Sequence, residues 1–421
     1  MKKYLKPDWL FTTSIYEVNI RQYTKSGTFK EFEQHLPRLK ELGFDLLWFM
    51  PIQPIGKINR KGILGSYYSI SDYRAINPEF GTMEDFKQLV NKIHKHGMHI
   101  IIDWVANHTS HDNVLTQTNP EFYNHNESGN FIAKVKEWTD VIDLNYKNPN
   151  LHNYMIDAMK FWLEKTEIDG FRCDVAFMVP LNFWEAATSE LKKIKPIVML
   201  AEAEGVQFHK KAFDITYNWT FYHLFNDISV QKKQAIDLIK AISQDMFSYS
   251  HYDNVLRLLF ITNHDENSWN GTVFERLGDS AEVFSILTYL LPGIPLVYSG
   301  QEIGLSKRLS FFEKDEIIWK ENRFTKLFKE LNILKNSNSF LRNSYNVDSF
   351  ELIESRNENI ISFIRKNGGE QILFIANLSP DFQFVKSLSD FKNFREINDK
   401  STVSDLVKLS GWDYKIYIEL R

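Results

Sequence analysis

Cysteine is nearly absent from this sequence of 421 residues, since Cys173 is its only one. A single cysteine excludes an intramolecular disulfide framework and a zinc site built from cysteines. No uninterrupted apolar stretch approaches the roughly 18 residues that a membrane-spanning helix needs. Long runs of lysine and arginine are also missing, and 50 basic against 54 acidic residues give a formal charge of −4. We therefore expect neither a nucleic acid nor a membrane as a partner.

The overall composition is that of a folded globular protein. Apolar residues make up 43% and charged residues 25%, which excludes disorder as the main state. Near the N-terminus, Lys6, Pro7 and Asp8 interrupt any apolar core of a signal peptide. We expect a cytoplasmic monomer; the alternative is a secreted or periplasmic protein whose signal peptide is not part of this sequence.

Short β-like runs alternate with amphipathic helical stretches over most of the chain, which is typical of βα units around a parallel sheet. Eight runs are predicted to be strands: Ile15–Ile20, Asp45–Met50, Met98–Asp103, Asp169–Val175, Pro196–Glu202, Asp214–Tyr217, Val255–Thr262 and Ile294–Tyr298. This number favours a closed (β/α)8 barrel of the TIM type over an open doubly wound sheet. The Gly-x-Gly-x-x-Gly turn expected after the first strand of a dinucleotide-binding open sheet is also missing.

The pattern divides the chain into a barrel domain over residues 1–340 and a smaller domain over 341–421. Residues 105–146 follow the third strand and are polar and rich in Asn, His and Asp, so we expect a short inserted domain with a functional role. Beyond residue 340, short alternating strands such as Ile360–Ile364 and Gln371–Ile375 predict an antiparallel all-β domain.

Acidic residues stand at or just beyond the ends of four predicted strands: Asp103, Asp174, Glu202 and Asp265. In a parallel barrel all C-terminal strand ends open onto one face, so we expect these acids to converge. A single acid at such a position is more often a helix cap or a turn residue. Four of them together favour a catalytic site instead.

Two of these acids stand in different local settings. Arg172 precedes Asp174 by two residues, so both side chains leave the strand on the same face and the guanidinium favours an ionised carboxylate. Glu202 follows an apolar run, and we expect no cation beside it, which would suit a general acid. An ionised nucleophile paired with a protonated acid is what retaining glycoside cleavage requires, with carboxyl groups about 5–5.5 Å apart. The alternative interpretation of Arg172 and Asp174 is a structural salt bridge at the barrel end.

Seven segments contain these acids and several histidines and tyrosines: Tyr68–Tyr73 with Phe80–Thr82, Asp103–His108, Val141–Asn145, Gly170–Asp174, Leu200–Gly205, Phe260–Asp265 and Gly300–Gly304. In this order they resemble the signatures of the α-amylase family of glycoside hydrolases. The resemblance implies a retaining hydrolase of α-linked glucans with the barrel, insert and C-terminal β domain described above. It also implies that the reaction itself needs no cofactor.

The resemblance assigns roles to the matching residues. Asp174 would be the nucleophile, Glu202 the acid/base, and Asp265 the group that binds and distorts the sugar. Four further residues would bind the substrate or orient the nucleophile. Arg172 would hold Asp174, and Tyr68 would stack on the sugar ring. His108 and His264 would bond sugar hydroxyls. Asp103 would tie the barrel end together.

A structural calcium ion is a further implication. Asn107, Asp143 and the backbone carbonyl of Met178 match the positions that hold it in family members. Calcium takes six to eight oxygen ligands, so more oxygens would be needed from the short insert. In the alternative, Asn107 and Asp143 hydrogen-bond to each other and to the backbone.

Departures from the family pattern leave the linkage open. Many α-amylases carry Lys-His where this chain has Phe177 and Met178, and Val175 is frequent in family members that cleave α-1,6 links. The main expectation is an α-amylase that cleaves α-1,4-glucosidic bonds in starch-type glucans. The alternatives are an α-glucosidase, an oligo-1,6-glucosidase or a glucanosyltransferase on the same scaffold. A non-catalytic glycan-binding relative is less favoured, because all three catalytic acids are present.

Overall fold

The computed structural model describes residues 6–252, 255–343, 347–386, 391 and 393–419. Eight parallel strands close into a barrel in the order β1-β10-β9-β8-β7-β6-β3-β2. The barrel strands are β1 Ile15–Val18, β2 Leu46–Phe49, β3 His99–Trp104, β6 Gly170–Cys173, β7 Val198–Ala201, β8 Ile215–Tyr217, β9 Leu256–Leu259 and β10 Ile294–Tyr298. Each coincides with one of the eight predicted runs, so the predicted barrel is confirmed.

Helices occupy the intervals between most of the strands. They are α1 Ile20–Tyr23, α2 Phe29–Phe32, α3 Leu36–Glu41, α4 Met83–Lys95, α6 Pro149–Thr166, α7 Leu181–Leu191, α8 Trp219–Ser229, α9 Ala235–Tyr249, α10 Val273–Leu277, α11 Ala281–Leu290 and α12 Arg323–Ser337. Local signals set their ends: Thr82 and Asp85 form a capping box at the start of α4, and Gly97 follows its end with φ of 67°. Each helix in the described part of the chain is too short or too polar to cross a bilayer.

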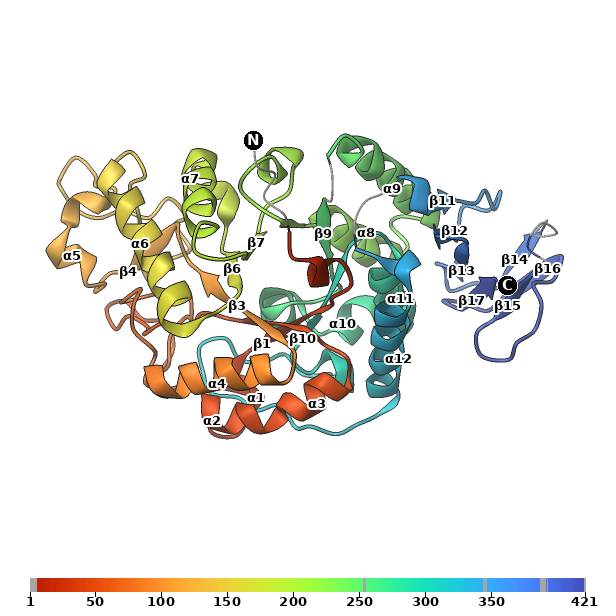
Figure 1. Ribbon diagram of the computed structural model, residues 1–421, viewed down its shortest axis with the longest axis horizontal. Helices are drawn as coiled ribbons and strands as arrows, with labels where there is room; N and C mark the ends of the chain where they lie inside the picture. The colour runs from red at the N-terminus through yellow and green to blue at the C-terminus, as the bar shows by residue number, and fades with distance from the viewer. Residues whose placement is uncertain (1–5, 253–254, 344–346, 387–390, 392, 420–421) are drawn as a thin grey trace. The chain divides into compact units, whose positions relative to one another are not determined.

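The segment after β3 forms the predicted insert, coloured orange to yellow in Figure 1. It contains β4 (His108–Ser110), α5 (Leu115–Thr118) and β5 (Val141–Asp143). The two strands pair antiparallel, with His108 opposite Asp143. The insert therefore places the end of the first signature directly beside the segment that closes the loop.

The C-terminal region is an antiparallel β domain, as predicted. Its strands are β11 Phe350–Leu352, β12 Ile360–Asn367, β13 Glu370–Asn377, β14 Gln383–Lys386, β15 Phe394–Glu396, β16 Leu406–Leu409 and β17 Tyr414–Glu419. They form one sheet in the order β11-β12-β13-β17-β15 and a second sheet of β14 and β16. Buried apolar residues from both sheets, including Leu373, Val385 and Val407, share one core.

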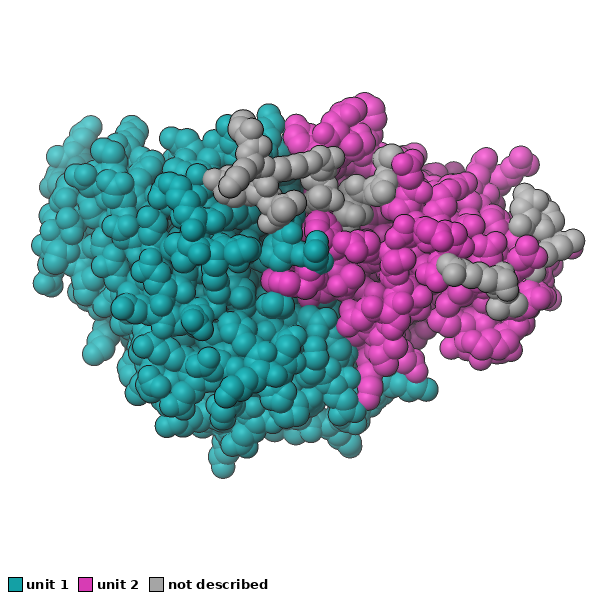
Figure 2. All heavy atoms as spheres, in the orientation of Figure 1, with its two compact units in different colours: residues 1–8, 14–217, 297–326 teal, residues 9–13, 218–296, 327–421 magenta. Residues whose placement is uncertain are grey.

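The chain divides into two compact units, coloured separately in Figure 2. The first comprises residues 1–8, 14–217 and 297–326, and the second comprises 9–13, 218–296 and 327–421. Asp103, Asp174 and Glu202 belong to the first unit, whereas His264 and Asp265 belong to the second.

A partly buried polar cluster lies at the N-terminal end of the barrel strands β3 and β6. The Asp169 carboxylate, just before β6, accepts the Ile100 N–H at 3.0 Å and lies 2.8 Å from His94 Nε2. Burial opposes the charge, but hydrogen bonds from His94, His99 and Ile100 outweigh it and hold the pKa of Asp169 well below its ordinary value. The ionised form of Asp169 therefore stabilises the fold.

Replacing Asp169 by Asn should lower the free energy of unfolding at pH 7 by about 1–3 kcal/mol. A carboxylate whose pKa is depressed by folding stabilises the protein above its unfolded pKa of about 3.9, and this contribution is lost as the pH falls further. The difference between wild type and variant should therefore narrow below about pH 4. Urea unfolding of both proteins at pH 7 and pH 3 measures this difference in the free energy of unfolding. If the difference is the same at both pH values, the ionised form of Asp169 does not stabilise the fold.

Candidate active site

One buried arginine joins three of the four predicted acids. The Arg172 side chain is fully buried at the end of β6, and its Nη1 lies 3.0 Å from Asp103 Oδ1 and 2.9 Å from Asp174 Oδ1. Its Nη2 lies 2.8 Å from Glu202 Oε2. Burial opposes the guanidinium charge, but the fields of Asp103, Tyr217 and Glu202 outweigh it and raise the pKa of Arg172 well above its ordinary value. The predicted convergence of these three acids is confirmed.

The expectation that Glu202 has no cation beside it is wrong. Arg172 and Glu202 are distant in sequence, but β6 and β7 are neighbouring parallel strands in which Arg172 pairs with Leu200. This register brings the guanidinium to Glu202 as well as to Asp174. A nearby cation therefore does not distinguish the two carboxylates, and their separate roles rest on the motifs that contain them.

A strained turn follows Asp174 and reaches Glu202. Val175 has φ of 34° and ψ of 46°, a left-handed conformation that is rare for a β-branched residue and costs about 1–3 kcal/mol. In this conformation its N–H donates a hydrogen bond of 2.8 Å to Glu202 Oε2. In the sequence, Val175 indicated only a linkage preference. Its backbone link to Glu202 follows from the turn geometry, which no residue pattern predicted.

Asp103 has the structural role expected of it. Its Oδ2 accepts hydrogen bonds from Trp48 Nε1 at 3.2 Å and from the Tyr68 hydroxyl at 3.0 Å. Asp103 thereby links the Tyr68 ring, which is 8% exposed, to the arginine that holds Asp174. Trp48 also places its ring 4.9 Å from Arg172 Cζ, and the Tyr217 hydroxyl accepts a 3.3 Å hydrogen bond from Arg172 Nε.

Trp48 and Tyr217 belong to this site although the sequence did not indicate them. Both stand in short buried strands, where an aromatic residue facing the barrel interior has the same sequence signature as an ordinary core residue. A position near the C-terminal end of a barrel strand is the one signal that could have drawn attention to them.

His108 is buried in the insert and is neutral at ordinary pH, because burial lowers its pKa to about 4. Its Nδ1 lies 3.2 Å from the side-chain nitrogen of Asn107, and an amide nitrogen can only donate. Nδ1 is therefore the acceptor, and the proton of the neutral ring is on Nε2. This tautomer provides an N–H donor suited to a sugar hydroxyl.

The second unit carries the fourth signature. His264 is buried, with its Nε2 3.2 Å from Asp265 Oδ2, while the Asp265 side chain is 39% exposed. A π-helical turn, Glu266–Asn270, starts directly after Asp265, and its first N–H donates to the Asn263 side chain at 2.8 Å. Such turns are frequent at functional sites. The motif therefore presents a partly exposed carboxylate beside a buried imidazole.

Two of the three positions predicted to hold calcium, Asn107 and Asp143, have defined contacts in the structure. Asp143 is buried, its Oδ2 accepts the Lys134 N–H at 2.9 Å, and burial raises its pKa. Among the described residues, no cationic side chain forms an ion pair with it. The Asn107 amide contacts His108 rather than Asp143.

A buried carboxylate that forms no ion pair with a cationic side chain of the described residues fits a hard cation, although the Lys134 charge does act on it. No cluster of three His, Cys, Asp or Glu side chains that could hold a metal occurs in the described part of the chain. Any cation bound here would therefore rely on amide and backbone oxygens, such as those of Asn107 and Met178, and calcium accepts such ligands.

Residues 10–127 and 119–348 match the family model for the α-amylase catalytic domain. The chain belongs to the α-amylase family of glycosidases. The matched region contains every signature segment named above. Family membership therefore accounts for the barrel and for the order of the acids along the chain.

Solved structures of α-amylases resemble the chain over nearly its whole length. An α-amylase from Lactobacillus plantarum is 30% identical, with a TM-score of 0.86 and coverage of 98% of this chain and 99% of that one. A maltogenic α-amylase from Thermotoga neapolitana is also 30% identical, with a TM-score of 0.88 and the same coverage. "Alpha-amylase 3" from Dictyoglomus thermophilum is 28% identical over 335 residues, which are 70% of this chain and 65% of that protein. The chain thus spans about two thirds of the length of this curated relative.

Proposed function

We propose that this protein is a retaining glycoside hydrolase that cleaves α-1,4-glucosidic bonds in starch-type glucans. The observation that carries the proposal is the guanidinium of Arg172, whose two terminal nitrogens contact Asp174 at 2.9 Å and Glu202 at 2.8 Å. Two carboxylates bound to one guanidinium lie close together. This shared contact is compatible with the spacing of about 5–5.5 Å that a retaining mechanism requires, whereas inverting enzymes separate their carboxyl groups by about 6.5–9.5 Å to admit a water molecule.

The proposed reaction is a double displacement. In the first step an Asp174 carboxylate oxygen attacks the anomeric carbon, the glycosidic C–O bond breaks, and protonated Glu202 transfers its proton to the departing oxygen. In the second step Glu202, now ionised, takes a proton from water as the water oxygen attacks the anomeric carbon and the bond to Asp174 breaks. The product keeps the α configuration and both carboxyl groups return to their starting forms.

The other site residues bind and orient the sugar in this proposal. Asp265 bonds and distorts the sugar that is being cleaved, and Tyr68 stacks on its ring. Nε2–H of His108 donates to a sugar hydroxyl, and His264 bonds another. Arg172 holds the Asp174 carboxylate in place through the 2.9 Å contact.

The α-1,4 preference is tested by products from soluble starch, pullulan and isomaltose. An internally cleaving α-amylase abolishes iodine staining of starch long before reducing sugar accumulates, and leaves isomaltose intact. Rapid glucose release with the stain retained would indicate an α-glucosidase, and cleavage of isomaltose an oligo-1,6-glucosidase. Products longer than the starting oligosaccharide would indicate a glucanosyltransferase. The structural neighbour that is a maltogenic α-amylase supports maltose as a main product to look for.

We also propose a structural calcium ion held by Asn107, Asp143 and the Met178 carbonyl. A ligand that binds only the folded state raises the melting temperature with its concentration. Thermal melts in chelator and in millimolar Ca²⁺ should therefore differ, and Asp143→Asn should remove the difference. Superimposable curves and no metal by elemental analysis would leave Asp143 as a purely hydrogen-bonded residue.

A further inference from the structure

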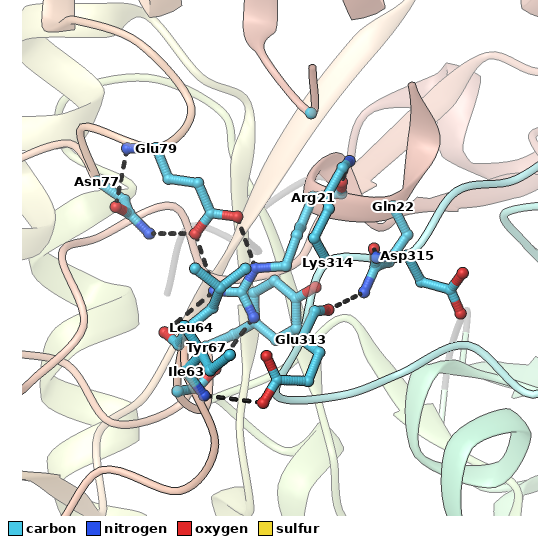
Figure 3. A network of polar contacts seen from close by, with 12 residues as sticks. Arg21, Gln22, Ile63, Leu64, Tyr67, Asn77, Glu79, Glu313, Lys314 and Asp315 are labelled. Carbon is cyan, nitrogen blue, oxygen red and sulfur yellow. Dashed lines mark hydrogen bonds and ion pairs between the residues drawn. The ribbon is translucent and has the colours of Figure 1, made fainter. Parts of the chain in front are cut away.

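Arg21, in the short helix α1, is a second buried arginine with every donor in use. Nε and Nη2 donate to the Glu79 carboxylate at 2.7 and 3.0 Å. Nη1 donates to the carbonyls of Gly65 at 3.0 Å and Phe311 at 3.3 Å. Nη2 also donates to the Leu64 carbonyl at 3.4 Å. Figure 3 shows the Arg21 guanidinium with the Glu79 carboxylate and Leu64 beside it. Because a guanidinium has five N–H bonds in one rigid plane, this arrangement fixes the position of each acceptor.

The acceptors belong to two loops that are far apart in sequence. One loop follows β2 and contains Leu64 and Gly65; the other follows β10 and contains Phe311. The neighbouring Gln22 also holds the second loop, since its Nε2 donates to the Ser310 and Glu313 carbonyls at 2.6 and 2.7 Å. The helix α1 thus acts as a common anchor for both loops.

These loops carry two aromatic rings that face each other. Tyr68 and Phe311 are stacked, with ring centroids 6.3 Å apart and planes 18° apart. Arg21 binds the backbone at Phe311 itself and at Gly65, three residues before Tyr68. The hydroxyl end of Tyr68 is held separately, by Asp103. The position of the Tyr68 ring is therefore set from one side by Asp103 and from the other by the two loops joined at Arg21.

We propose that Arg21 is a positioning residue for the sugar-stacking face of Tyr68. This inference rests on the proposed function, in which Tyr68 stacks on the sugar being cleaved. Displacing a ring by a fraction of an ångström removes contact with the sugar in the transition state without removing any group that touches the substrate. The lysine ammonium keeps the positive charge beside Glu79 but lacks the planar fork, so it cannot hold both loops at once.

A double-mutant cycle between Arg21 and Tyr68 tests the proposal. Tyr68→Ala and Arg21→Lys should each lower kcat/KM by about tenfold or more. The double variant should lose little more than Tyr68→Ala alone, because both substitutions remove the same interaction. Active-site titration corrects each value for the fraction of folded enzyme. Arg365→Lys is the matched control, since Arg365 is equally buried and donates to the Leu290 and Arg342 carbonyls in the second unit. It should leave kcat/KM unchanged.

If Arg21→Lys does not fold, Gln22→Ala takes its place in the cycle, because Gln22 anchors the same loop without a buried charge. If the double variant loses kcat/KM by the full product of the two single losses, the positioning role of Arg21 is overturned and the stacking role of Tyr68 stays intact. A Tyr68→Ala variant with wild-type kcat/KM would overturn both the stacking role and the inference drawn from it.

Discussion

Replacing Asp174 by Asn is expected to lower kcat/KM on starch by about 10⁴-fold or more while the protein still folds. The amide is nearly the same shape as the carboxylate but cannot form the covalent bond to the sugar. Glu202→Gln should have a similarly large effect on a natural substrate, because its leaving group needs the proton. Circular dichroism and thermal melts establish folding, and initial rates on soluble starch measure the loss.

The matched control is Asp214→Asn. Asp214 is also a buried aspartate in an ion pair, 2.9 Å from Lys192, but it lies before β8 and hence at the opposite end of the barrel strands. The Asp214→Asn variant should be less stable than the wild type but hydrolyse starch at the same rate per folded molecule. A folded Asp174→Asn enzyme with near-wild-type activity would refute the role of Asp174.

Azide separates the roles of the two carboxylates. In Asp174→Ala the small anion can enter from the face that the carboxylate vacates and give a β-glycosyl azide from an activated α-glycoside. In Glu202→Ala it should instead react with the covalent intermediate and give the α-glycosyl azide. If the two variants gave the opposite anomers of the glycosyl azide, Glu202 would be the nucleophile and Asp174 the acid/base.

Replacing Arg172 by Met is expected to lower the free energy of unfolding by about 3–5 kcal/mol, the largest stability effect anticipated for a single substitution here. The change removes the cation that contacts Asp103, Asp174 and Glu202, and the buried charges of Asp103 and Asp174 then repel one another. Urea unfolding at pH 7 measures the loss.

Arg257→Met provides the comparison for this prediction. Arg257 is equally buried in β9, but it faces the Asp245 carboxylate at the longer distance of 3.7 Å. Its loss should therefore cost less than that of Arg172. Equal destabilisation by the two substitutions would mean that burial of the side chain, rather than neutralisation of the acid cluster, sets the stability.

Much of the fold could be predicted because local signals and the three-dimensional structure agree. The run Ile100–Ile102 is buried on both faces in β3, as continuous β-branched sequence indicates for a parallel strand. Gly97, with φ of 67°, ends a helix where a left-handed residue is needed. The alternation of strands and helices then left few arrangements other than the barrel.

The site was predictable only in part, since its chemistry depends on contacts between strands. Two-residue alternation placed Arg172 beside Asp174, but no local pattern contains its 2.8 Å contact with Glu202. The same limit applies to Arg21, whose partners Glu79 and Phe311 lie 58 and 290 residues away in sequence. Its five hydrogen bonds follow from how the two loops fold over α1.

The central claim is that Asp174 forms a covalent bond to the sugar during turnover, and trapping that intermediate tests it most directly. The enzyme forms this intermediate from an α-glycosyl fluoride that carries a second fluorine on the ring, and the intermediate is then hydrolysed slowly. Hydrolysis is slow because the second fluorine destabilises the cationic transition state. Intact mass followed by peptide mapping locates the label. The account predicts one glycosyl group per protein molecule, on Asp174, and α-anomer as the first product by proton NMR; a label on Glu202, or β-anomer as the first product, would contradict it.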